Sequence, residues 1–226
     1  MTTQSHNSSP QRLLDRTAAG KALAAKLKAY ANQPDTLVLA LPRGGLPVAY
    51  EVAQTLNLSL DICLVRKLGL PGYPEVAMGA IASAGVRILN RALIDRLTVP
   101  EALIDQVAAV ELRELERRDR VYRGDRYPLP VRGRTIILVD DGLATGSTMR
   151  AAISLLEAQQ AGPIIIAVPV LPPAVCQDLE QSGYRVVRLA TPSPFYAISL
   201  WYENFAQVTD REVTRLLGKP DMKLTA

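Results

Sequence analysis

Five strand-length segments, most of them continuously apolar, are the strongest constraint on how this chain can fold. They are TLVLAL (36–41), LDICLVR (60–66), GRTIILVD (133–140), PIIIAVPVL (163–171) and YRVVRLA (184–190). Strands that are apolar on both faces and separated by helices are typical of a parallel sheet covered on both sides. We therefore predict an α/β fold with a doubly wound, mostly parallel sheet.

Helix-like segments separate and flank these strands. They cover 11–31, 46–56, 99–122, 146–160, 172–183 and 209–218. In the third of them, Pro100 suits a first helical turn, and Glu114 with Arg118 forms an i,i+4 pair. We predict a solvated helical face there and not a nucleic-acid-binding patch. Between the second and third strands we predict a loop at 67–77 and then a short hairpin.

The composition of the chain is that of a globular protein. Of its 226 residues, 48% are hydrophobic, and no apolar run approaches the ~20 residues that span a bilayer. We predict a disordered tail at 1–10 and one domain at 11–226, with no membrane segment. Cys63 and Cys176 lie in apolar or helical segments, so we expect reduced, buried thiols in a cytoplasmic protein.

The only histidine, His6, falls in the predicted tail. Its position argues against a Ser-His-Asp triad, a Cys-His pair and a His-rich zinc site. Acid–base or metal chemistry must then come from carboxylates, lysine, tyrosine or backbone groups. The net charge of +4 suits a polyphosphate ligand as well as nucleic acid, and no long basic block favours the latter.

Three loops follow predicted strands at the edge where parallel sheets bind ligands. They are LPRGG (41–45), RKLG (66–69) and DDGLATGST (140–148). The third leads directly into a helix, so free N–H groups and the helix dipole make an anion site there. Its threonine and serine hydroxyls add donors of a size that suits phosphate oxygens.

The same loop begins with two acids, Asp140 and Asp141. They would repel a second anion, but they can accept hydrogen bonds from hydroxyls or help to hold a hard cation. The combination predicts a ligand with a phosphate near a vicinal diol, as in a ribose 5-phosphate. The letters of a P-loop and of a dinucleotide fingerprint are both absent. The alternative without a ligand is a helix cap followed by a solvated acid.

The segment VDDGLATGST (139–148) closely resembles the phosphoribosyl-pyrophosphate (PRPP) signature of type I phosphoribosyltransferases. The resemblance extends through DRTAAGKALA, LPRGGLPVA, VRKLGLPGYPEVAMGAIA and YENFAQVTDREV, so it covers most of the chain. It is closest to the bacterial predicted phosphoribosyltransferases. It implies their fold, with a helical insertion at about 90–123 and a small hood built from the N- and C-terminal segments.

The resemblance also implies roles for single residues. The PRPP-binding set is Arg43, Gly44, Gly45, Asp140, Asp141, Gly142, Ala144, Thr145, Gly146, Ser147 and Thr148. In this set the two aspartates bind the ribose hydroxyls and contribute weakly or indirectly to a metal site. The segment 144–148 holds the 5-phosphate. Arg43 and the glycines after it receive pyrophosphate, and without a Cβ their backbone can close on a phosphate. An ordinary strand-to-helix turn is the alternative for this short loop.

Lys67 begins what resembles the flexible catalytic loop of the family, so the implied catalytic residues are Lys67, Arg43, Asp140 and Asp141. The implied base-binding residues are Glu75, Phe195, Tyr196 and Trp201. Flat rings suit stacking on a planar base, although core packing explains an aromatic cluster equally well. Ala144 stands where hypoxanthine/guanine enzymes carry a further acid, which disfavours a 6-oxopurine acceptor.

The activity that the resemblance implies is a Mg²⁺-dependent transfer. The 5-phosphoribosyl group of PRPP moves to a nitrogenous base or another amine, and pyrophosphate is released. We therefore expect a pentosyltransferase of nucleotide metabolism with PRPP, an acceptor and Mg²⁺ as its ligands, and a homodimer by resemblance alone. A non-enzymatic PRPP sensor or RNA-binding regulator on the same fold is the alternative. The Arg66-Lys67 pair favours the enzyme.

Overall fold

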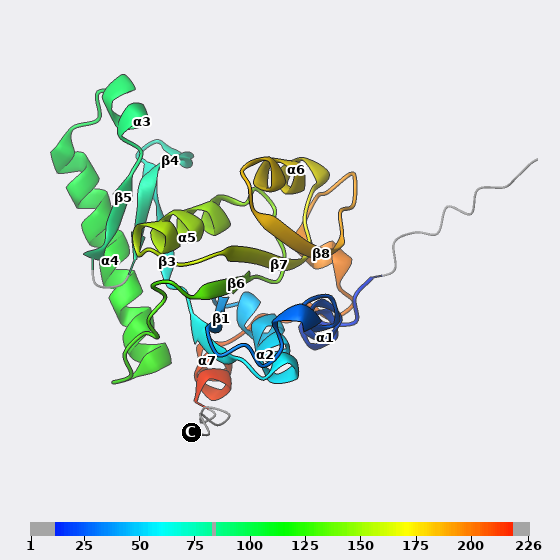
Figure 1. Ribbon diagram of the computed structural model, residues 1–226. Helices are drawn as coiled ribbons and strands as arrows, with labels where there is room; N and C mark the ends of the chain where they lie inside the picture. Colours follow the sequence, from blue (N-terminus) through cyan, green and yellow to red (C-terminus); the bar gives the residue numbers. More distant parts are fainter. Residues whose placement is uncertain (1–11, 83–84, 219–226) are drawn as a thin grey trace, which may run out of the picture.

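The computed structural model describes residues 12–82 and 85–218, and the predicted tail at 1–10 lies outside them. Its centre is a five-stranded sheet in the order β2-β1-β6-β7-β8 (Figure 1). These strands are β1 (Thr36–Ala40), β2 (Ser59–Ile62), β6 (Thr135–Val139), β7 (Ile164–Val170) and β8 (Arg185–Ala190). All four neighbouring pairs are parallel. The prediction of a doubly wound parallel sheet is therefore confirmed.

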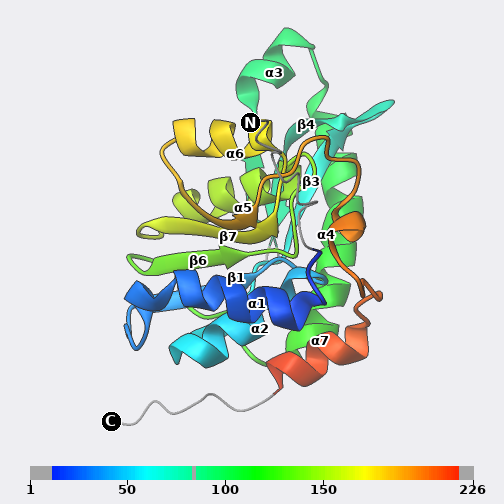
Figure 2. The same cartoon turned by 90° about the vertical axis from the view of Figure 1, so that its right-hand side faces the viewer.

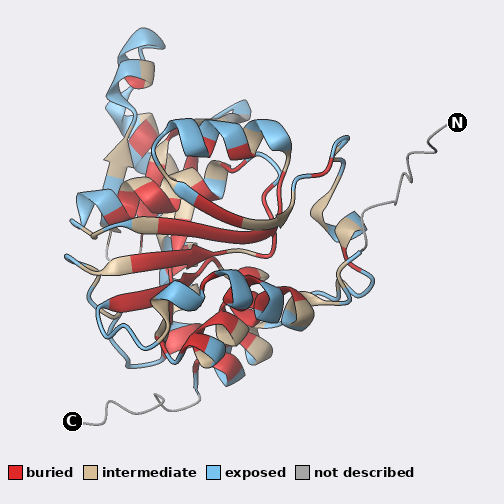
Figure 3. Ribbon diagram, turned by 45° about the vertical axis from the view of Figure 1, so that its right-hand side comes forward, coloured by how far each residue is buried: buried red, intermediate tan, exposed pale blue. Residues whose placement is uncertain are grey.

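Helices cover both faces of this sheet. On one side lie α1 (Arg16–Lys26) and α2 (Gly45–Leu56), and on the other α5 (Ser147–Ala158) and α6 (Pro173–Gln181) (Figure 1). Successive side chains of β1 enter different cores: Val38 and Ala40 pack with α1 and α2, whereas Leu37 and Leu39 pack with α5 and α6. The central strands are accordingly buried along almost their whole length (Figure 3). Their sequences read as continuously apolar because neither face meets water.

Side-chain caps start two of the helices near the chain ends. The carboxylate of Asp15 accepts a hydrogen bond of 2.7 Å from the backbone N–H of Ala18 at the start of α1. The hydroxyl of Thr209 accepts one of 3.2 Å from Glu212 at the start of α7 (Asp210–Leu217). Such caps satisfy N–H groups that have no partner within the helix.

The segment 60–66, predicted as one strand, is divided between two sheets. β2 ends at Ile62, and a separate antiparallel sheet of three strands follows. Its strands are β3 (Val65–Leu70), β4 (Tyr73–Ala82) and β5 (Arg87–Leu89). The buried residues Cys63 and Leu64 join the two sheets, so hydropathy alone could not locate the change of sheet.

The loop predicted at 67–77 is wrong. Most of it forms an antiparallel hairpin of β3 and β4, whose turn contains Gly72 at φ +81°. Its glycines and prolines suggested irregular backbone, but β3 and β4 pack against α5 and α4 (Glu101–Arg123), and this tertiary contact supports the strands. The short hairpin predicted after the loop corresponds to the pairing of β4 with β5.

The long helix predicted at 99–122 is confirmed by α4, which follows the short α3 (Arg91–Arg96). Figure 2 shows α4 running beside β3 and down to α7. Glu114 accepts hydrogen bonds from both Arg118 and Arg117 on its solvated side, at 2.7 and 2.8 Å. The interpretation of this region as an insertion stays a prediction.

Candidate active site

The order of the parallel strands places a switch point between β1 and β6. In the sheet, β2 lies beyond β1 on one side of this point, whereas β7 and β8 lie beyond β6 on the other side. In sheets of this kind, ligands bind outside the carboxyl ends of the two strands at such a point. The loops that leave β1 and β6 are 41–44 and 140–146, so two of the three predicted loops meet here.

These two loops are in contact. A Cβ added to Gly45 would lie 2.7 Å from the Val139 carbonyl oxygen and 2.8 Å from the Asp140 Cα. A Cβ added to Gly44 would lie 2.0 Å from Asp141 Oδ2. Only glycine lets the first loop approach the carboxylates this closely. The peptide bond between Pro42 and Arg43 in the same loop is cis.

The two aspartates of the second loop lie in different surroundings. Asp141 is only 8% exposed, whereas Asp140 is partly buried. Asp140 Oδ1 accepts a hydrogen bond of 2.8 Å from the backbone N–H of Asp141. Desolvation raises the pKa of both carboxyl groups above the ordinary value, and the neighbouring Asp141 carboxylate adds to the rise at Asp140. Arg16 opposes the rise at Asp141.

Arg16, the first residue of α1, is a site residue that sequence reasoning missed. Its Nε and Nη2 atoms both lie 2.8 Å from Asp141 Oδ2. The guanidinium also donates to the Ala206 carbonyl at 2.7 Å and stacks 3.8 Å above the centre of the Phe205 ring. Arg16 lies 125 positions before Asp141, so no local spacing could have signalled the pair.

The loop at 144–148 is partly open to solvent, because Ala144, Thr145 and Thr148 are exposed whereas Gly146 is buried. Gly146 adopts the left-handed conformation at φ +74° and precedes Ser147, the first residue of α5. No side chain caps this helix start. The hydroxyls of Thr145 and Ser147 lie 3.0 Å apart, and Thr148 is exposed in the first turn. The Ser147 N–H donates to the Thr145 hydroxyl at 3.4 Å, a long bond that a ligand could replace. The N–H groups of this helix start, the positive end of the helix dipole and these hydroxyls together suit a phosphate-sized anion.

Arg43 points from the first loop toward the start of α7. Its Nη1 donates to the Val208 carbonyl at 3.3 Å, and its Nε lies 3.7 Å from Asp210 Oδ1. Asp210 is shared, because it also accepts a hydrogen bond of 2.6 Å from Tyr122 and lies 3.8 Å from Arg117. Burial raises the pKa of Tyr122 to about 12, and the bond to Asp210 adds to the rise. Tyr122 of α4 is therefore connected to Arg43 of the first loop through the carboxylate of Asp210.

A cavity of about 390 Å³ lies where these elements meet. It is lined by Arg16, Arg43, Gly44, Asp141, Phe205, Gln207 and Val208. The cavity thus joins residues from the start of α1, both loops and the segment before α7. A cavity with two guanidinium groups and a carboxylate suits a polar, anionic ligand.

The aromatic residues expected near a base lie in two different environments. Phe195 and Trp201 stack on each other with ring centres 6.4 Å apart, in a cluster with the buried Tyr202. Tyr196 is 79% exposed. It is Tyr202 that reaches the acids, because its hydroxyl donates to the Asp141 carbonyl at 2.6 Å. Base binding by the first three stays a prediction.

The remaining predicted residues lie elsewhere. Lys67 is in β3, opposite Ala80, and does not line the cavity, so its catalytic role stays a prediction. Its neighbour Arg66 forms an ion pair with Glu111 of α4. The backbone of Glu75 belongs to β4, but its side chain lies outside what the structure describes.

Gly142, directly after the acid pair, lies in a tightly packed position. A Cβ at this position would lie 2.7 Å from Ile198 Cγ2 and 3.1 Å from Val170 Cγ2. Leu13 and Tyr202 form a parallel bridge within the hood that was predicted from the two chain ends. The loop packs tightly against Ile198 and against Val170 of β7, and the hood as a unit stays a prediction.

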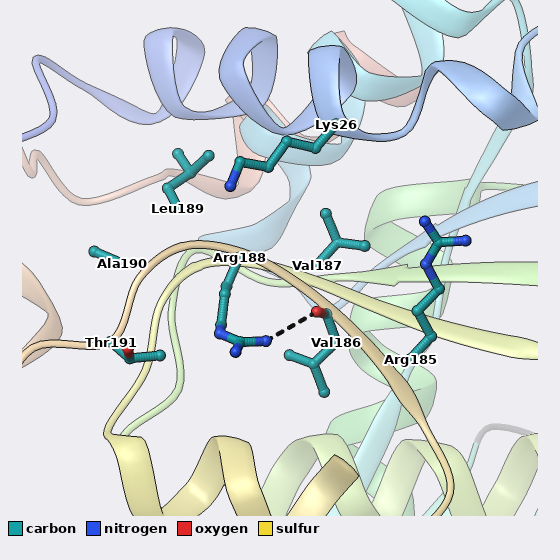
Figure 4. Close-up of a pocket in the computed structure, with 8 residues that line it drawn as sticks. All are labelled: Lys26, Arg185, Val186, Val187, Arg188, Leu189, Ala190 and Thr191. Carbon is teal, nitrogen blue, oxygen red and sulfur yellow. Dashed lines mark hydrogen bonds between the residues drawn. The ribbon is translucent and has the colours of Figure 1, made fainter.

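A second cavity, of about 420 Å³, lies along the edge strand β8 (Figure 4). It is lined by Lys26, Arg185, Val186, Val187, Arg188, Leu189, Ala190 and Thr191. Arg188 donates to the Val186 carbonyl of the same strand at 3.2 Å and to Glu180 at 2.6 Å. None of the residues that line this second cavity belongs to the two loops at the switch point. The first cavity is therefore the candidate active site.

Two further searches bear on function. In residues 12–82 and 85–218, no cluster of three or more His, Cys, Asp or Glu side chains could hold a metal ion by itself. Over the same ranges, none of the helices combines the length and the apolar character needed to cross a membrane.

Comparisons with known proteins bear on the family of the chain. A family model described as the phosphoribosyl transferase domain matches residues 11–195. "Putative phosphoribosyl transferase Rv0571c" of Mycobacterium tuberculosis (strain ATCC 25618 / H37Rv) is 42% identical over 205 residues, which are 91% of this chain and 46% of that protein. A ribose-phosphate pyrophosphokinase of Mycobacterium leprae (strain TN) is 39% identical over 150 residues, 65% of this chain and 43% of that protein.

A solved structure is similar over nearly the whole chain. The crystal structure of TT1426 from Thermus thermophilus is 38% identical, with a TM-score of 0.84, and the match covers 92% of this chain and 98% of that one. The chain spans about half the length of the curated relatives it matches. On the family model and the 42% identity, the chain belongs to the phosphoribosyl transferase domain family.

Proposed function

We propose that this protein is a Mg²⁺-dependent phosphoribosyltransferase that moves the 5-phosphoribosyl group of PRPP to a nitrogenous base and releases pyrophosphate. One observation carries the proposal: at the switch point, an open helix start and an acid pair lie on one loop that contacts a glycine loop from the neighbouring strand. PRPP needs these three features, because it has a phosphate, a diol and a pyrophosphate.

In this proposal each loop binds one part of PRPP. The N–H groups and hydroxyls at 144–148 hold the 5-phosphate. Asp140 and Asp141 accept hydrogen bonds from the ribose hydroxyls. The loop at 41–45 receives pyrophosphate, which needs Arg43 to exchange its contacts with Val208 and Asp210 for the ligand. The nucleophile then attacks C1 of the ribose from the face opposite the departing pyrophosphate.

The acid pair also fits a bound Mg²⁺. This ion takes one or two carboxylates and completes its shell with substrate phosphates and water, and two adjacent carboxylates suit that demand. When bound, Mg²⁺ would neutralise charge on the leaving pyrophosphate. Arg43 and the backbone of the glycine loop would supply the protein's share of that stabilisation.

The acceptor would sit under the hood, near the exposed Ala144 and the aromatic cluster around Tyr202. Because Ala144 offers no acid, we propose a base other than a 6-oxopurine. We also propose a cytoplasmic location in nucleotide metabolism, which the free, buried Cys63 and Cys176 support. A homodimer stays a prediction.

The test combines binding and turnover. Calorimetry with Mg²⁺ should detect PRPP binding, and a panel of bases and amines should reveal an acceptor that releases pyrophosphate. Asp140→Asn with Asp141→Asn should abolish both signals, whereas the exposed Asp105→Asn should leave them unchanged. Absence of PRPP binding by the wild-type protein would refute the proposal. PRPP binding without turnover on any acceptor would indicate a sensor.

A further inference from the structure

Arg16 lies in the candidate site, but none of the three predicted loops contains it. Its side chain is 11% exposed and contacts Asp141, which is also 11% exposed at the side chain. It lines the same cavity as Arg43. The cavity therefore receives one guanidinium from α1 and one from the glycine loop.

The surroundings of Arg16 hold it in place and leave part of it for a ligand. The Phe205 ring covers one face, and the Ala206 carbonyl and Asp141 accept from its nitrogen atoms. A guanidinium has five N–H donors in a planar fork. The contacts of Nε, Nη1 and Nη2 use three of them, which leaves two donors on a group that lines the cavity.

The charges around the cavity favour a polyanion. The guanidinium groups of Arg16 and Arg43 lie on its lining with one carboxylate, Asp141. α2 begins at Gly45, so the positive end of its dipole points toward the same loop. Asp210 lies beside Arg43, but Tyr122 and Arg117 remain as its partners when Arg43 turns to a ligand.

Planar guanidinium groups bind phosphate oxygens with two parallel donors, so they discriminate by geometry as well as by charge. A pair of them across one cavity suits a ligand with two linked phosphates better than a ligand with one. The 5-phosphate would be held elsewhere, at the start of α5. The cavity therefore matches the pyrophosphate part of PRPP.

We propose that Arg16 binds the pyrophosphate of PRPP while it bridges to Asp141, and so links the leaving group to the carboxylate that holds the ribose. This inference rests on the proposed function. It makes Arg16 a specificity residue that distinguishes PRPP from ribose 5-phosphate. A residue that only held Asp141 in position would affect both ligands equally.

The test measures three ligands separately by calorimetry: PRPP, ribose 5-phosphate and inorganic pyrophosphate. Arg16→Gln should weaken PRPP and pyrophosphate on the order of 10- to 100-fold, the range for a lost charge-assisted hydrogen bond, and ribose 5-phosphate less than about threefold. Arg16→Lys keeps the charge without the fork, so it should recover part of the loss. Arg12→Gln is the matched control, because Arg12 lies in the same segment and donates to the Tyr202 carbonyl. It should leave all three affinities within about twofold.

Two results would overturn the inference. One is an equal loss of PRPP and ribose 5-phosphate affinity in Arg16→Gln, which would mean that Arg16 acts only through Asp141. The other is pyrophosphate affinity that does not change in Arg16→Gln and Arg16→Lys. Thermal melts show whether Arg16→Gln folds. If it does not, the loss of PRPP affinity is compared with the loss of ribose 5-phosphate affinity in Arg16→Lys instead. If the wild-type protein binds pyrophosphate but not PRPP, the proposed function is refuted. The role of Arg16 is then decided by the pyrophosphate affinities of the wild type and the Arg16 variants alone.

Discussion

The two glycine loops at the switch point, each of which we propose to bind an anion, are built in different ways. The loop at 144–148 exposes Ala144, Thr145 and Thr148, and its proposed site consists of backbone N–H groups and short hydroxyls at one helix start. The loop at 41–45 is enclosed by Arg16, Asp141 and Val208, which come from distant parts of the chain. The open loop is a local structure, whereas the enclosed loop depends on the whole fold. Substitutions in the enclosed loop should therefore disturb residues that are distant in the sequence, whereas substitutions in the open loop should act mainly on the loop itself.

The largest effect should come from Gly44→Ala in the enclosed loop. Its methyl group would lie 2.0 Å from Asp141 Oδ2, so the carboxylate must leave both the loop and Arg16. We expect kcat/KM to fall at least ~100-fold, because a displacement of this size misplaces the reacting groups. Urea denaturation should show a loss of about 1–3 kcal/mol from overpacking.

A double-mutant cycle tests that cause. Asp141→Ser shortens the side chain that the methyl group would meet, so the stability cost of Gly44→Ala should shrink in that background. An undiminished cost would show that another contact encloses the loop.

In the open loop, Gly146→Ala should have a smaller effect. The residue needs φ +74°, and its methyl group would lie 3.1 Å from Val175 Cγ1. We expect about 1–2 kcal/mol of lost stability and roughly 10-fold weaker PRPP binding. Gly72→Ala is the control, since Gly72 has φ +81° and a Cβ there would meet nothing within 4 Å. It should lose similar stability with unchanged PRPP affinity, and weaker PRPP binding in Gly72→Ala would contradict the assignment of the phosphate site.

Tyr202→Phe measures how far the enclosed side depends on the hood. The lost hydroxyl leaves the Asp141 carbonyl without a donor in a buried setting, which should cost about 1–2 kcal/mol in chemical denaturation. Tyr184→Phe removes a similar bond of 2.6 Å at an exposed site, to Glu157. Its effect should stay within about 0.5 kcal/mol. Equal losses in the two variants would refute the dependence on the hood.

Asp140→Asn should stabilise the fold slightly at neutral pH. The pKa of Asp140 is raised in the folded protein, so its ionised form is unfavourable there relative to the unfolded chain. Removing the charge should increase stability at pH 7, and the gain should shrink as the pH falls from the raised pKa of the folded protein to the ordinary carboxyl pKa of the unfolded chain, below which Asp140 is neutral in both states. Melting temperatures from pH 3 to pH 8 give the profile. A stability difference between the variant and the wild type that stays constant from pH 3 to pH 8 would contradict this prediction.

The open loop could be predicted from sequence because its parts are contiguous. The strand ending at Val139, the two acids and the helix starting at Ser147 occur within a few residues of one another. The enclosed loop could be predicted only in part. Its glycines indicated a close approach, but nothing near 41–45 indicated that Asp210 would contact Arg43. The pairing of β3 with β4 was also missed, since packing against α4 and α5 overrides the loop-forming preference of the glycines and prolines there.

The sequence by itself determined the parallel sheet and the two loops at its switch point. Burial on both faces makes the strands continuously apolar, and helix starts and close turns require particular residues at particular places. Only the tertiary structure decided that Arg16 meets Asp141 and that α4 reaches Arg43 through Asp210. Long side chains from separate elements meet only where packing brings those elements together, and pairs separated by more than a hundred residues have no local pattern.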